Sequence, residues 1–414
     1  MDSPAMQATE LTPSELPEAI DRALNGDSIL VLPRTRDGAI AEVEPGSWAG
    51  SGPAPALILF TSGSTGAAKG VALSAEALTT SAWATERFLA GPGVWHLCLP
   101  VNHIAGFQVE LRARLAGRAP VRTTSARFTG DSFAAEIEDL LTGAGERPAY
   151  TSLVPTQLHR VLENEQASAA AARCEAILLG GSSISPALLD RADERGLSIV
   201  RTYGMSETAG GCVYDGIPFD GVAVTISEAG TIDLHGDVVA ETYVDIGDDG
   251  TITALPSTTL TRDGQGRRMI RTSDLGRLDA GVLTVLGRAD DIIISGGENV
   301  SPHALETGLL PSWQKHGIAE VLVTWVPDEE WGKRIVGLVR LGDDVDSAVE
   351  ETLDSPRGLA RLLTGLDHGM GGLLPTEVFV VEQIPNRSIG KPDRRAAADL
   401  ALRLEGPDAE YPMK

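Results

Sequence analysis

Residues whose side chains suit phosphate binding gather at positions 61–70, where the sequence is Thr-Ser-Gly-Ser-Thr-Gly-Ala-Ala-Lys-Gly. Its glycines allow the backbone to approach a ligand closely, its hydroxyls can donate hydrogen bonds, and Lys69 adds a positive charge. An apolar run at 56–60 precedes it, and a helical pattern at 74–90 that opens with a serine follows it. We therefore expect a strand, a loop and a helix that bind a polyphosphate. The segment lacks the Gly-Lys-Ser/Thr of a Walker A loop, and the alternative is a flexible polar linker.

A second polar segment, residues 201–208, has the sequence Arg-Thr-Tyr-Gly-Met-Ser-Glu-Thr and directly follows an apolar run. It therefore belongs at the carboxyl end of a strand, which is where open α/β sheets bind their ligands. The carboxylate of Glu207 could hold Mg²⁺, a hard cation that prefers carboxylate and phosphate oxygens. The hydroxyl of Ser206 could donate a hydrogen bond to a phosphate. An ordinary polar turn is the alternative.

A third set of polar residues comprises Arg-Thr-Ser-Asp at 271–274 and Gly-Arg-Ala-Asp-Asp at 287–291. An aspartate such as Asp274 can accept hydrogen bonds from two ribose hydroxyls, and an arginine such as Arg288 can lie beside it. This combination suits a nucleotide site, and surface charge beside a turn is the alternative. Near the end, Lys391 lies in a basic loop, where a lone lysine is usually solvated.

The elements that must position these residues fall into three zones. Between residues 94 and 203, apolar strands alternate with helices, which predicts parallel βαβ units. Short alternating runs with Gly and Asp turns at 222–285 predict an antiparallel β subdomain. We expect an α/β protein with a large N-terminal domain at 1–289 and a small, mobile α+β C-terminal domain at 290–414. The individual elements we expect are helices at 15–24, 104–116, 185–195, 302–309, 345–353 and 394–404, and strands at 28–33, 94–100, 176–180, 198–203, 320–326, 334–341 and 376–381.

Composition narrows the class of partner. The chain has 414 residues and a net charge of -24 at pH 7, which repels nucleic acids and anionic membranes. Its three cysteines, Cys98, Cys174 and Cys212, are too widely spaced for a disulfide framework or a zinc site. Residues 1–17 lack the apolar core of a signal peptide, and no apolar run approaches the ~20 residues of a membrane helix. We expect a cytoplasmic protein, and the sequence leaves a homo-oligomer open.

The order and spacing of the polar segments are more specific than any one of them. Together they resemble the adenylate-forming superfamily of acyl-CoA synthetases, luciferases and peptide-synthetase adenylation domains, over residues 56–400. The resemblance implies that the chain uses ATP, Mg²⁺ and coenzyme A. Serine at 206 replaces the family's threonine and keeps the hydroxyl, while Ser273 replaces the family's glycine. The ATP-binding residues that the resemblance implies are Thr61, Ser62, Gly63, Ser64, Thr65, Gly66, Lys69, Gly181, Ser182, Ser183, Tyr203, Gly204, Asp274 and Arg288.

The resemblance also implies a mechanism in two steps. A carboxylate attacks the α-phosphate of ATP, and Lys391, Glu207 and Ser206 are the catalytic residues of that step, with Glu207 holding Mg²⁺. The C-terminal domain then turns about Asp290, and the loop at Gly297 comes in to line a tunnel for the thiol of coenzyme A. One site would thereby serve two half-reactions.

The segment at 99–106, Leu-Pro-Val-Asn-His-Ile-Ala-Gly, resembles the part of the family that walls the acyl pocket. Together with the short chain, Gly-Gly-Ser-Ser at 180–183 and Ser-Gly-Gly-Glu-Asn at 295–299, it looks most like the o-succinylbenzoate–CoA ligases of menaquinone (vitamin K2) biosynthesis. That likeness implies an acid-binding role for His103, Arg112 and Gly204, with Arg112 holding the carboxylate that does not react. For Arg112 the alternative is a surface arginine that pairs with Glu110 or Asp139.

Other functions stay open from the sequence. One is a ligase for another aryl or short-chain acid, and another is a non-catalytic nucleotide-binding relative. A peptide-synthetase adenylation domain is disfavoured because no carrier domain follows Lys391. Five residues argue against the non-catalytic relative and for the enzyme, namely Lys69, Glu207, Asp274, Arg288 and Lys391.

Overall fold

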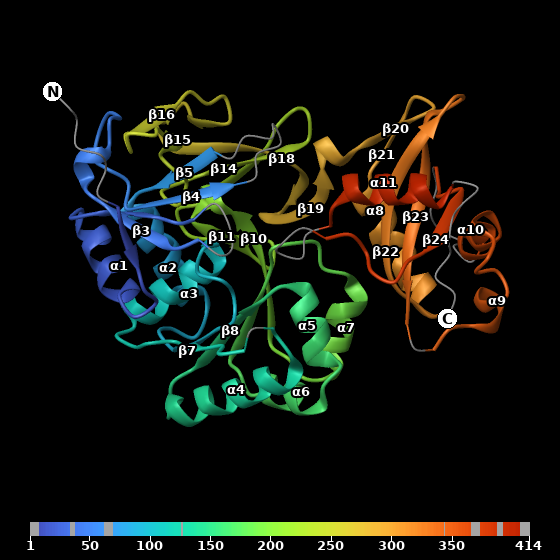
Figure 1. Ribbon diagram of the computed structural model, residues 1–414, viewed down its shortest axis with the longest axis horizontal. Helices are drawn as coiled ribbons and strands as arrows, with labels where there is room; N and C mark the ends of the chain where they lie inside the picture. Colours follow the sequence, from blue (N-terminus) through green and yellow to red (C-terminus); the bar gives the residue numbers. More distant parts are fainter. Residues whose placement is uncertain are drawn as a thin grey trace. The chain divides into compact units, whose positions relative to one another are not determined.

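The computed structural model describes residues 8–33, 38–61, 69–125, 127–342, 344–365, 373–386 and 392–405. Contacts divide the chain into two units. Unit 1 comprises Met1–Gly181, Arg191–Thr272 and Leu278–Thr284, and unit 2 comprises Ser182–Asp190, Ser273–Arg277 and Val285–Lys414. The expected α/β class, with a large N-terminal part, is confirmed (Figure 1). The boundary between residues 289 and 290, and the mobility of the C-terminal part, stay predictions.

The central sheet of unit 1 carries the expected parallel strands. In spatial order its strands are β12 (Ile217–Pro218), β11 (Gly210–Tyr214), β10 (Ile199–Met205), β9 (Ala176–Leu179), β8 (Ala149–Leu153), β6 (Val94–Leu97) and β7 (Val121–Arg122). The pairs from β10 to β7 are parallel, and β11 and β12 turn back antiparallel. Because β10 ends at Met205, the polar segment that follows it lies at a carboxyl edge, as expected.

Helices cover both faces of this sheet because its strands are apolar on both sides. Successive side chains of a strand point to opposite faces. Trp95 of β6 meets Arg112 of α3 (Ile104–Leu115), whereas the next residue, His96, bonds to Glu136 of α4 (Gly130–Ala144). Helices α3 and α4 therefore lie on opposite faces. Helix α2 (Ala75–Phe88) packs beside α3, and α5 (Pro155–Leu162) and α6 (Glu165–Ala171) pack beside α4.

A second sheet in unit 1 holds the ends of the predicted phosphate loop. Its order is β1 (Thr9–Leu11), β3 (Ile40–Val43), β2 (Ile29–Val31), β4 (Leu57–Thr61), β5 (Lys69–Leu73), β15 (Thr242–Ile246) and β16 (Ile252–Leu255). Strands β1 and β3 were not expected from the sequence. A third, antiparallel sheet contains β13 (Ala223–Ile226), β14 (Thr231–His235), β18 (Arg268–Asp279), β17 (Leu260–Arg262) and β19 (Val282–Arg288). The predicted β subdomain is thus present only in part, because β15 and β16 join the second sheet instead.

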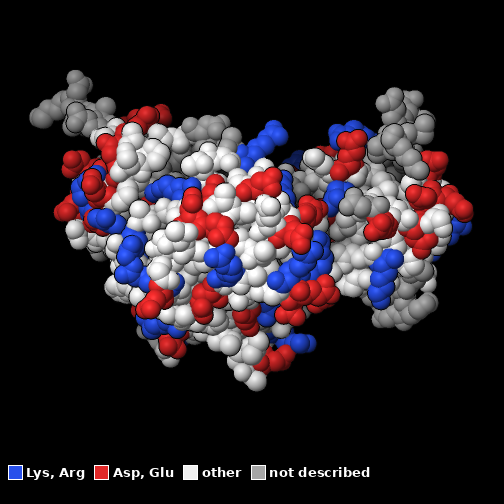
Figure 2. Space-filling view, turned by 90° about the horizontal axis from the view of Figure 1, so that it is seen from below, with Lys and Arg blue, Asp and Glu red and all other residues white. Residues whose placement is uncertain are grey.

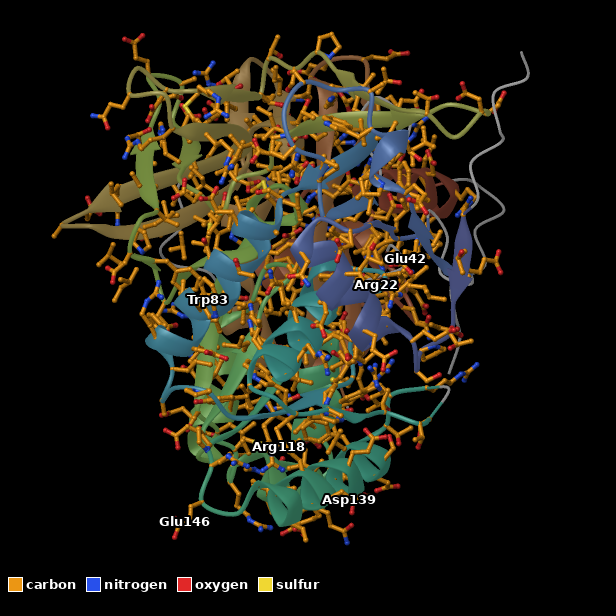
Figure 3. The ribbon with its side chains drawn as sticks, turned by 90° about the vertical axis from the view of Figure 1, so that its left-hand side faces the viewer. Arg22, Glu42, Trp83, Arg118, Asp139 and Glu146 are labelled. Atoms are coloured by element: carbon orange, nitrogen blue, oxygen red, sulfur yellow. The ribbon has the colours of Figure 1, made fainter. Side chains whose placement is uncertain are left out.

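Helix α1 (Leu16–Asn25) is fixed to the edge of the second sheet by a charged pair. The guanidinium of Arg22 donates from Nε to Oε1 of Glu42 and from Nη2 to Oε2, each at 2.7 Å, and Figure 3 shows the two side chains pointing toward one another. The hydrogen bond from Arg22 holds the pKa of Glu42 below its usual range. This two-pronged ion pair links α1 to β3 beside the buried apolar face of the helix, which comprises Leu16, Ala19, Ile20 and Ala23.

Unit 2 is built on a three-stranded sheet of β22 (Ile318–Asp328), β23 (Gly332–Leu341) and β24 (Glu377–Val380). Helices α8 (Pro302–Gln314) and α10 (Pro356–Gly365) cover one face and α11 (Arg394–Leu404) covers the other. Consecutive residues of β22 point to opposite faces of the sheet. Val323 belongs to the same hydrophobic cluster as Trp313 of α8, whereas Leu322 belongs to the cluster that contains Ala397 of α11. The hairpin of β20 (Ile293–Ser295) and β21 (Glu298–Val300) precedes α8.

The helix expected at 345–353 was wrong in its extent. The structure has a single turn, α9 (Ser347–Glu350), and a separate helix α10 that the sequence analysis did not predict. Pro356 explains the break, because the residue before a proline is disfavoured in the helical conformation while proline itself suits the first turn of a new helix. The hydroxyl of Ser355 caps α10 by accepting from the backbone N–H of Gly358 at 3.1 Å.

Acidic and basic side chains are interspersed over the face shown in Figure 2. The net charge of -24 is therefore not gathered into one acidic area on that face. Within the described ranges, none of the helices has the length and apolar character needed to cross a bilayer.

Candidate active site

The two ends of the predicted phosphate loop are partners in a hairpin. Strands β4 and β5 pair antiparallel, with Thr61 opposite Lys69. The expectation that the loop runs directly into a helix was wrong, because Val71 and Leu73 are buried and make residues 69–73 a central strand. Helix α2 begins only afterwards. The predicted binding residues Ser62, Gly63, Ser64, Thr65 and Gly66 lie outside the described residues.

Thr208 stabilises the turn that carries Ser206 and Glu207. These residues form a short 3₁₀ turn, Ser206–Thr208, directly after β10. The buried hydroxyl of Thr208 donates to the carbonyl oxygen of Gly210 at 2.7 Å and accepts from the backbone N–H of Met205 at 2.9 Å. Both ends of the turn are therefore tied to one side chain, and the side chains of Ser206 and Glu207 remain half-buried at the sheet's edge.

The backbone on either side of this turn is tightly constrained, at Gly204 before it and at Ala209 after it. Ala209 has a φ of 51°, and its carbonyl oxygen accepts from Ser81 of α2 at 3.0 Å and from Gln108 of α3 at 2.9 Å. A Cβ on Gly204 would lie 2.1 Å from the carbonyl oxygen of Gly210. The family's glycine at position 204 thus has a structural cause here, which is the close approach of β10 and β11 at a bulge.

Three residues from distant parts of unit 1 meet beside this turn. The hydroxyl of Tyr243, on β15, donates to Oε1 of Glu207 at 3.0 Å. The ammonium of Lys69 lies 5.8 Å from the centroid of the same phenol ring. Burial, followed by the charge of Glu207, raises the pKa of Tyr243. The structure therefore brings the predicted phosphate lysine and the predicted metal carboxylate to one tyrosine.

Three residues that shape this site were not predicted from the sequence, namely Tyr243, Thr208 and Gln108. Tyr243 lies in no motif, and its partners are far from it in the chain, so no local pattern could have found it. For Thr208 a signal existed, since a hydroxyl just after two predicted site residues in a turn often bonds to nearby backbone groups.

The predicted ribose-binding residues lie together in unit 2. The guanidinium Nη1 of Arg288 is 3.6 Å from Oδ1 of Asp274. The same guanidinium forms a fork with the predicted hinge residue, donating from Nε to Oδ1 of Asp290 at 2.8 Å and from Nη2 to Oδ2 at 2.7 Å. The hydrogen bond to Asp290 raises the pKa of Arg288. Arg288 therefore stands between the predicted nucleotide contact and the predicted hinge.

Two of the three predicted acid-binding residues, His103 and Arg112, belong to α3, whereas Gly204 lies on β10. His103 is the half-buried N-cap residue of α3, and Gly106 in the first turn allows the carbonyl oxygen of Pro100 to lie 2.2 Å from where a Cβ would be. Arg112 is 3% exposed, so the surface alternative is wrong, and Glu110 pairs with Arg122 instead.

The surroundings of Arg112 are unusual for a cation. Its guanidinium carbon lies 5.3 Å from the centroid of the Trp95 ring, and its Nε is buried without a hydrogen-bond partner. Burial lowers the pKa of Arg112, while Tyr214 and Glu86 oppose that effect. One buried oxygen of Glu86 also lacks a partner, and burial raises the pKa of this carboxyl.

The remaining predicted positions are glycines, serines and one lysine. Gly181 has a φ of 87°, and Gly297 has a φ of 86° in the turn of the β20–β21 hairpin, so both occupy conformations that favour glycine. Ser182 is half-buried and Ser183 is exposed. Tyr203 is half-buried on β10. Lys391 lies outside the described residues.

The carboxylate of Glu207 suits a divalent cation that is bound together with the phosphates of a nucleotide. Across the described ranges, no group of three or more His, Cys, Asp or Glu side chains is arranged to hold a metal ion. Mg²⁺ commonly takes only one or two carboxylates, and its other ligands are phosphate oxygens and water. A single half-buried carboxylate such as Glu207, beside a cationic Lys69, matches that donor set.

The sequence can be assigned to a known protein family. The sequence profile of the AMP-binding enzymes matches residues 18–265. The chain belongs to the AMP-binding enzyme family.

Its relatives are more specific. A probable 2-succinylbenzoate–CoA ligase of Mycobacterium tuberculosis is 37% identical over 409 residues, which cover 97% of this chain and 97% of the relative. A 2-succinylbenzoate–CoA ligase of Listeria monocytogenes is 30% identical and covers 91% of this chain and 75% of the relative. Both belong to the group of ligases that the sequence analysis singled out.

Solved structures agree with this. The o-succinylbenzoate CoA synthetase of Bacillus subtilis in complex with the acyl-adenylate OSB-AMP is similar with a TM-score of 0.63 at 25% identity, over 87% of this chain and 70% of that chain. The same enzyme with ATP and a magnesium ion is similar with a TM-score of 0.63 at 26% identity, over 83% of this chain and 69% of that chain. The predicted superfamily is confirmed.

Proposed function

We propose that this chain is an ATP-dependent o-succinylbenzoate–CoA ligase of menaquinone biosynthesis. It converts o-succinylbenzoate and ATP into the acyl-adenylate and diphosphate, and then transfers the acyl group to coenzyme A with release of AMP. The observation that carries this proposal is 37% identity to a probable ligase of this kind over 97% of both chains. The three cysteines in the sequence are all buried and free, which suits a reducing compartment, and we place the enzyme in the cytoplasm.

In the first step the substrate carboxylate attacks the α-phosphate of ATP. We assign the β- and γ-phosphates to the loop between Thr61 and Lys69. Ser206 donates to a phosphate oxygen, and Glu207 meets the Mg²⁺ that accompanies the nucleotide. Bound Mg²⁺ supplies neutralisation of the phosphate charge. Lys391 stabilises the charge that develops between the α-phosphate and the carboxylate, an effect worth several kcal/mol for a well-placed cation.

The nucleoside end would be held by the other predicted residues. Asp274 accepts from the ribose hydroxyls with Arg288 beside it, and the backbone around Gly181 and Tyr203 forms the adenine wall. The left-handed Gly181 and the bulge after Tyr203 favour this, because both leave backbone close to a flat ligand.

For the second step we propose that Asp290 is the hinge. A turn there would exchange Lys391 for the hairpin tip at Gly297, which would then line the path of the coenzyme A thiol. The fork between Arg288 and Asp290 is consistent with this, because a change at the hinge would alter the position of a ribose-binding side chain.

For the acid we propose that His103 and Gly204 shape the pocket and that Arg112 holds the non-reacting carboxylate. The buried Nε of Arg112 that lacks a partner supports this, because a substrate carboxylate would satisfy it. A guanidinium binds a planar carboxylate through two parallel hydrogen bonds, which also orients the acid.

The test measures the two half-reactions separately. ATP–diphosphate exchange should depend on o-succinylbenzoate, and mass spectrometry should detect o-succinylbenzoyl-CoA once coenzyme A is added. Benzoate, indoleacetate and short-chain acids serve as competing substrates. Exchange that prefers one of these would replace the proposed acid, and no exchange with any acid would favour a non-catalytic nucleotide-binding protein.

A further inference from the structure

We propose that Tyr243 is a positioning residue for the first step. Its phenol holds the Glu207 carboxylate in the orientation that binds a divalent cation, and it links this carboxylate to Lys69. The inference rests on the proposed function, because it assumes that Glu207 meets the cation. The phenol touches two predicted site residues that belong to different segments of the chain.

The hydrogen bond has a defined direction. The hydroxyl of Tyr243 lies 3.0 Å from Oε1 of Glu207. Because an ionised carboxylate can only accept hydrogen bonds, the phenol is the donor. A donated hydrogen bond stabilises the ionised carboxylate, and the ionised form is the one that binds Mg²⁺.

The backbone of Glu207 is already fixed from the same side. Its carbonyl oxygen accepts from the backbone N–H of Ala240 at 2.8 Å, just ahead of β15. Thr208 fixes the turn from within. With the backbone held, the orientation of the carboxylate depends on the side-chain torsions of Glu207, and the phenol restricts these.

The sheet holds the phenol itself in place. Tyr243 is opposite Val71 of β5 and opposite Leu255 of β16, so the backbone of β15 is paired on both sides. Lys69 begins β5, and its ammonium lies 5.8 Å from the ring centroid, within the range of a cation–π contact. The face of the Tyr243 ring therefore contacts the ammonium of Lys69, and its hydroxyl donates to the carboxylate of Glu207.

Removal of the hydroxyl should weaken metal-dependent nucleotide binding. Groups that orient a metal ligand through a hydrogen bond typically change metal affinity or activity by about 10–100-fold when they are lost. We expect Tyr243→Phe to show at least about tenfold weaker binding of a non-hydrolysable ATP analogue in the presence of Mg²⁺. In EDTA its affinity for the analogue should equal that of the unaltered protein. The concentration of Mg²⁺ for half-maximal ATP–diphosphate exchange should rise in the same proportion.

A matched control is Tyr150→Phe. Tyr150 also lies in unit 1 and also donates its hydroxyl, to the carbonyl oxygen of Gly91 at 2.9 Å. Its loss should lower the melting temperature without any change in the Mg²⁺ dependence. This separates a role in orienting Glu207 from the general effect of deleting a tyrosine hydroxyl.

Glu207→Gln separates the inference from the proposed function. Loss of Mg²⁺-dependent binding in both Glu207→Gln and Tyr243→Phe supports both statements. Loss in Glu207→Gln alone, measured by titration calorimetry on the folded variants, overturns the role of Tyr243 and leaves the proposed metal contact. If Glu207→Gln binds the analogue with the same Mg²⁺ dependence as the unaltered protein, the metal contact is wrong and the inference falls with it.

Discussion

Arg112 bears a positive charge inside unit 1, where a cation is costly unless it is paired. Within the protein, Tyr214 and Glu86 of α2 contribute favourably to the electrostatics of Arg112, and in the proposed function the substrate carboxylate is a further partner. These roles differ in what they require, because the interactions with Tyr214 and Glu86 matter for stability whereas a substrate contact matters for the Michaelis constant.

Arg112→Lys should therefore raise the KM for o-succinylbenzoate by at least about tenfold, which corresponds to ~1.4 kcal/mol of binding. Lysine keeps the charge but cannot form the two parallel hydrogen bonds. The KM for ATP should move little. A lower melting temperature with an unchanged KM for the acid would mean that Arg112 interacts only with its neighbours in the protein, Tyr214 and Glu86.

A substitution at Gly204 tests the backbone geometry of β10 just before the turn that carries Ser206 and Glu207. Gly204→Ala should destabilise the protein by about 1–3 kcal/mol, the usual cost of forcing extra atoms into a packed region. The added Cβ would lie 2.1 Å from the carbonyl oxygen of Gly210. Gly143→Ala is the matched control, since Gly143 lies in α4 with nothing within 4 Å of the added atom.

The control should be stabilised by up to about 1 kcal/mol, because alanine favours a helix. Thermal unfolding of both variants measures the contrast. Equal melting temperatures for the two variants would contradict the close approach of β10 and β11.

At the scale of elements, the turn between β17 and β18 depends on one ionised carboxylate. Asp263 Oδ1 accepts from the backbone N–H groups of Gln265 at 2.9 Å and Arg267 at 3.0 Å, and Oδ2 accepts from Nε of Arg267 at 2.8 Å. Burial alone would raise the pKa of Asp263, but these hydrogen bonds outweigh it and lower the pKa to about 2.

A lowered pKa gives a pH dependence of known sign. The folded state favours the ionised carboxyl, so the contribution of Asp263 to stability is present above its ordinary pKa of 3.8 and is lost as the pH falls toward about 2. Asp263→Asn should therefore unfold at a lower temperature than the unaltered protein at pH 7. That difference should shrink below pH 4, and a difference that is constant with pH would rule out this role.

The proposed hinge at Asp290 can be tested with a pair of variants at that position. Asp290 lies in the 3₁₀ turn Ala289–Asp291. Asp290→Pro fixes φ and restricts the residue before it, so acyl-adenylate should form while transfer to coenzyme A fails. Asp290→Ala loses the fork with Arg288 but keeps backbone freedom, and it should retain both steps in larger part. Equal loss of the two steps in Asp290→Pro, measured by quenched-flow assay, would place the hinge elsewhere.

The sequence predicted elements well where a pattern is local. Helices α2 and α11 follow apolar spacing and a side-chain N-cap, α3 follows an apolar stretch without such a cap, and the three main strands of unit 2 follow apolar runs. The hairpin of β4 and β5 was missed because polar Lys69 and Gly70 hide the start of a strand whose pairing is decided by β15. Tyr243 was not predicted either, because its contact with Glu207 depends on the position of β15 next to β5, which no local pattern in the sequence indicates.

At the scale of the molecule, each unit has a hydrophobic core of its own. The two clusters of unit 2 contain only residues from 293 to 404, among them Trp313, which is fully buried and donates from Nε1 to the carbonyl oxygen of Leu363 at 3.0 Å. A separate chain of residues 285–414 should therefore fold alone and unfold cooperatively. Near-ultraviolet circular dichroism would show this, as would a blue-shifted component of the tryptophan fluorescence that is lost in Trp313→Phe. A fragment without either signal would mean that its cores need the rest of the chain.

The position of β5 between β4 and β15 also affects how the protein is made. Strand β5 ends at Leu73, and its second neighbour does not begin until Thr242. While the ribosome synthesises the residues between them, β5 has an unpaired edge beside buried-type side chains, and such edges recruit strands from other chains. A nascent chain of this protein should therefore depend on chaperones until β15 emerges. Fragments that end before residue 242 should aggregate, whereas fragments that extend past Ile246 should remain in solution.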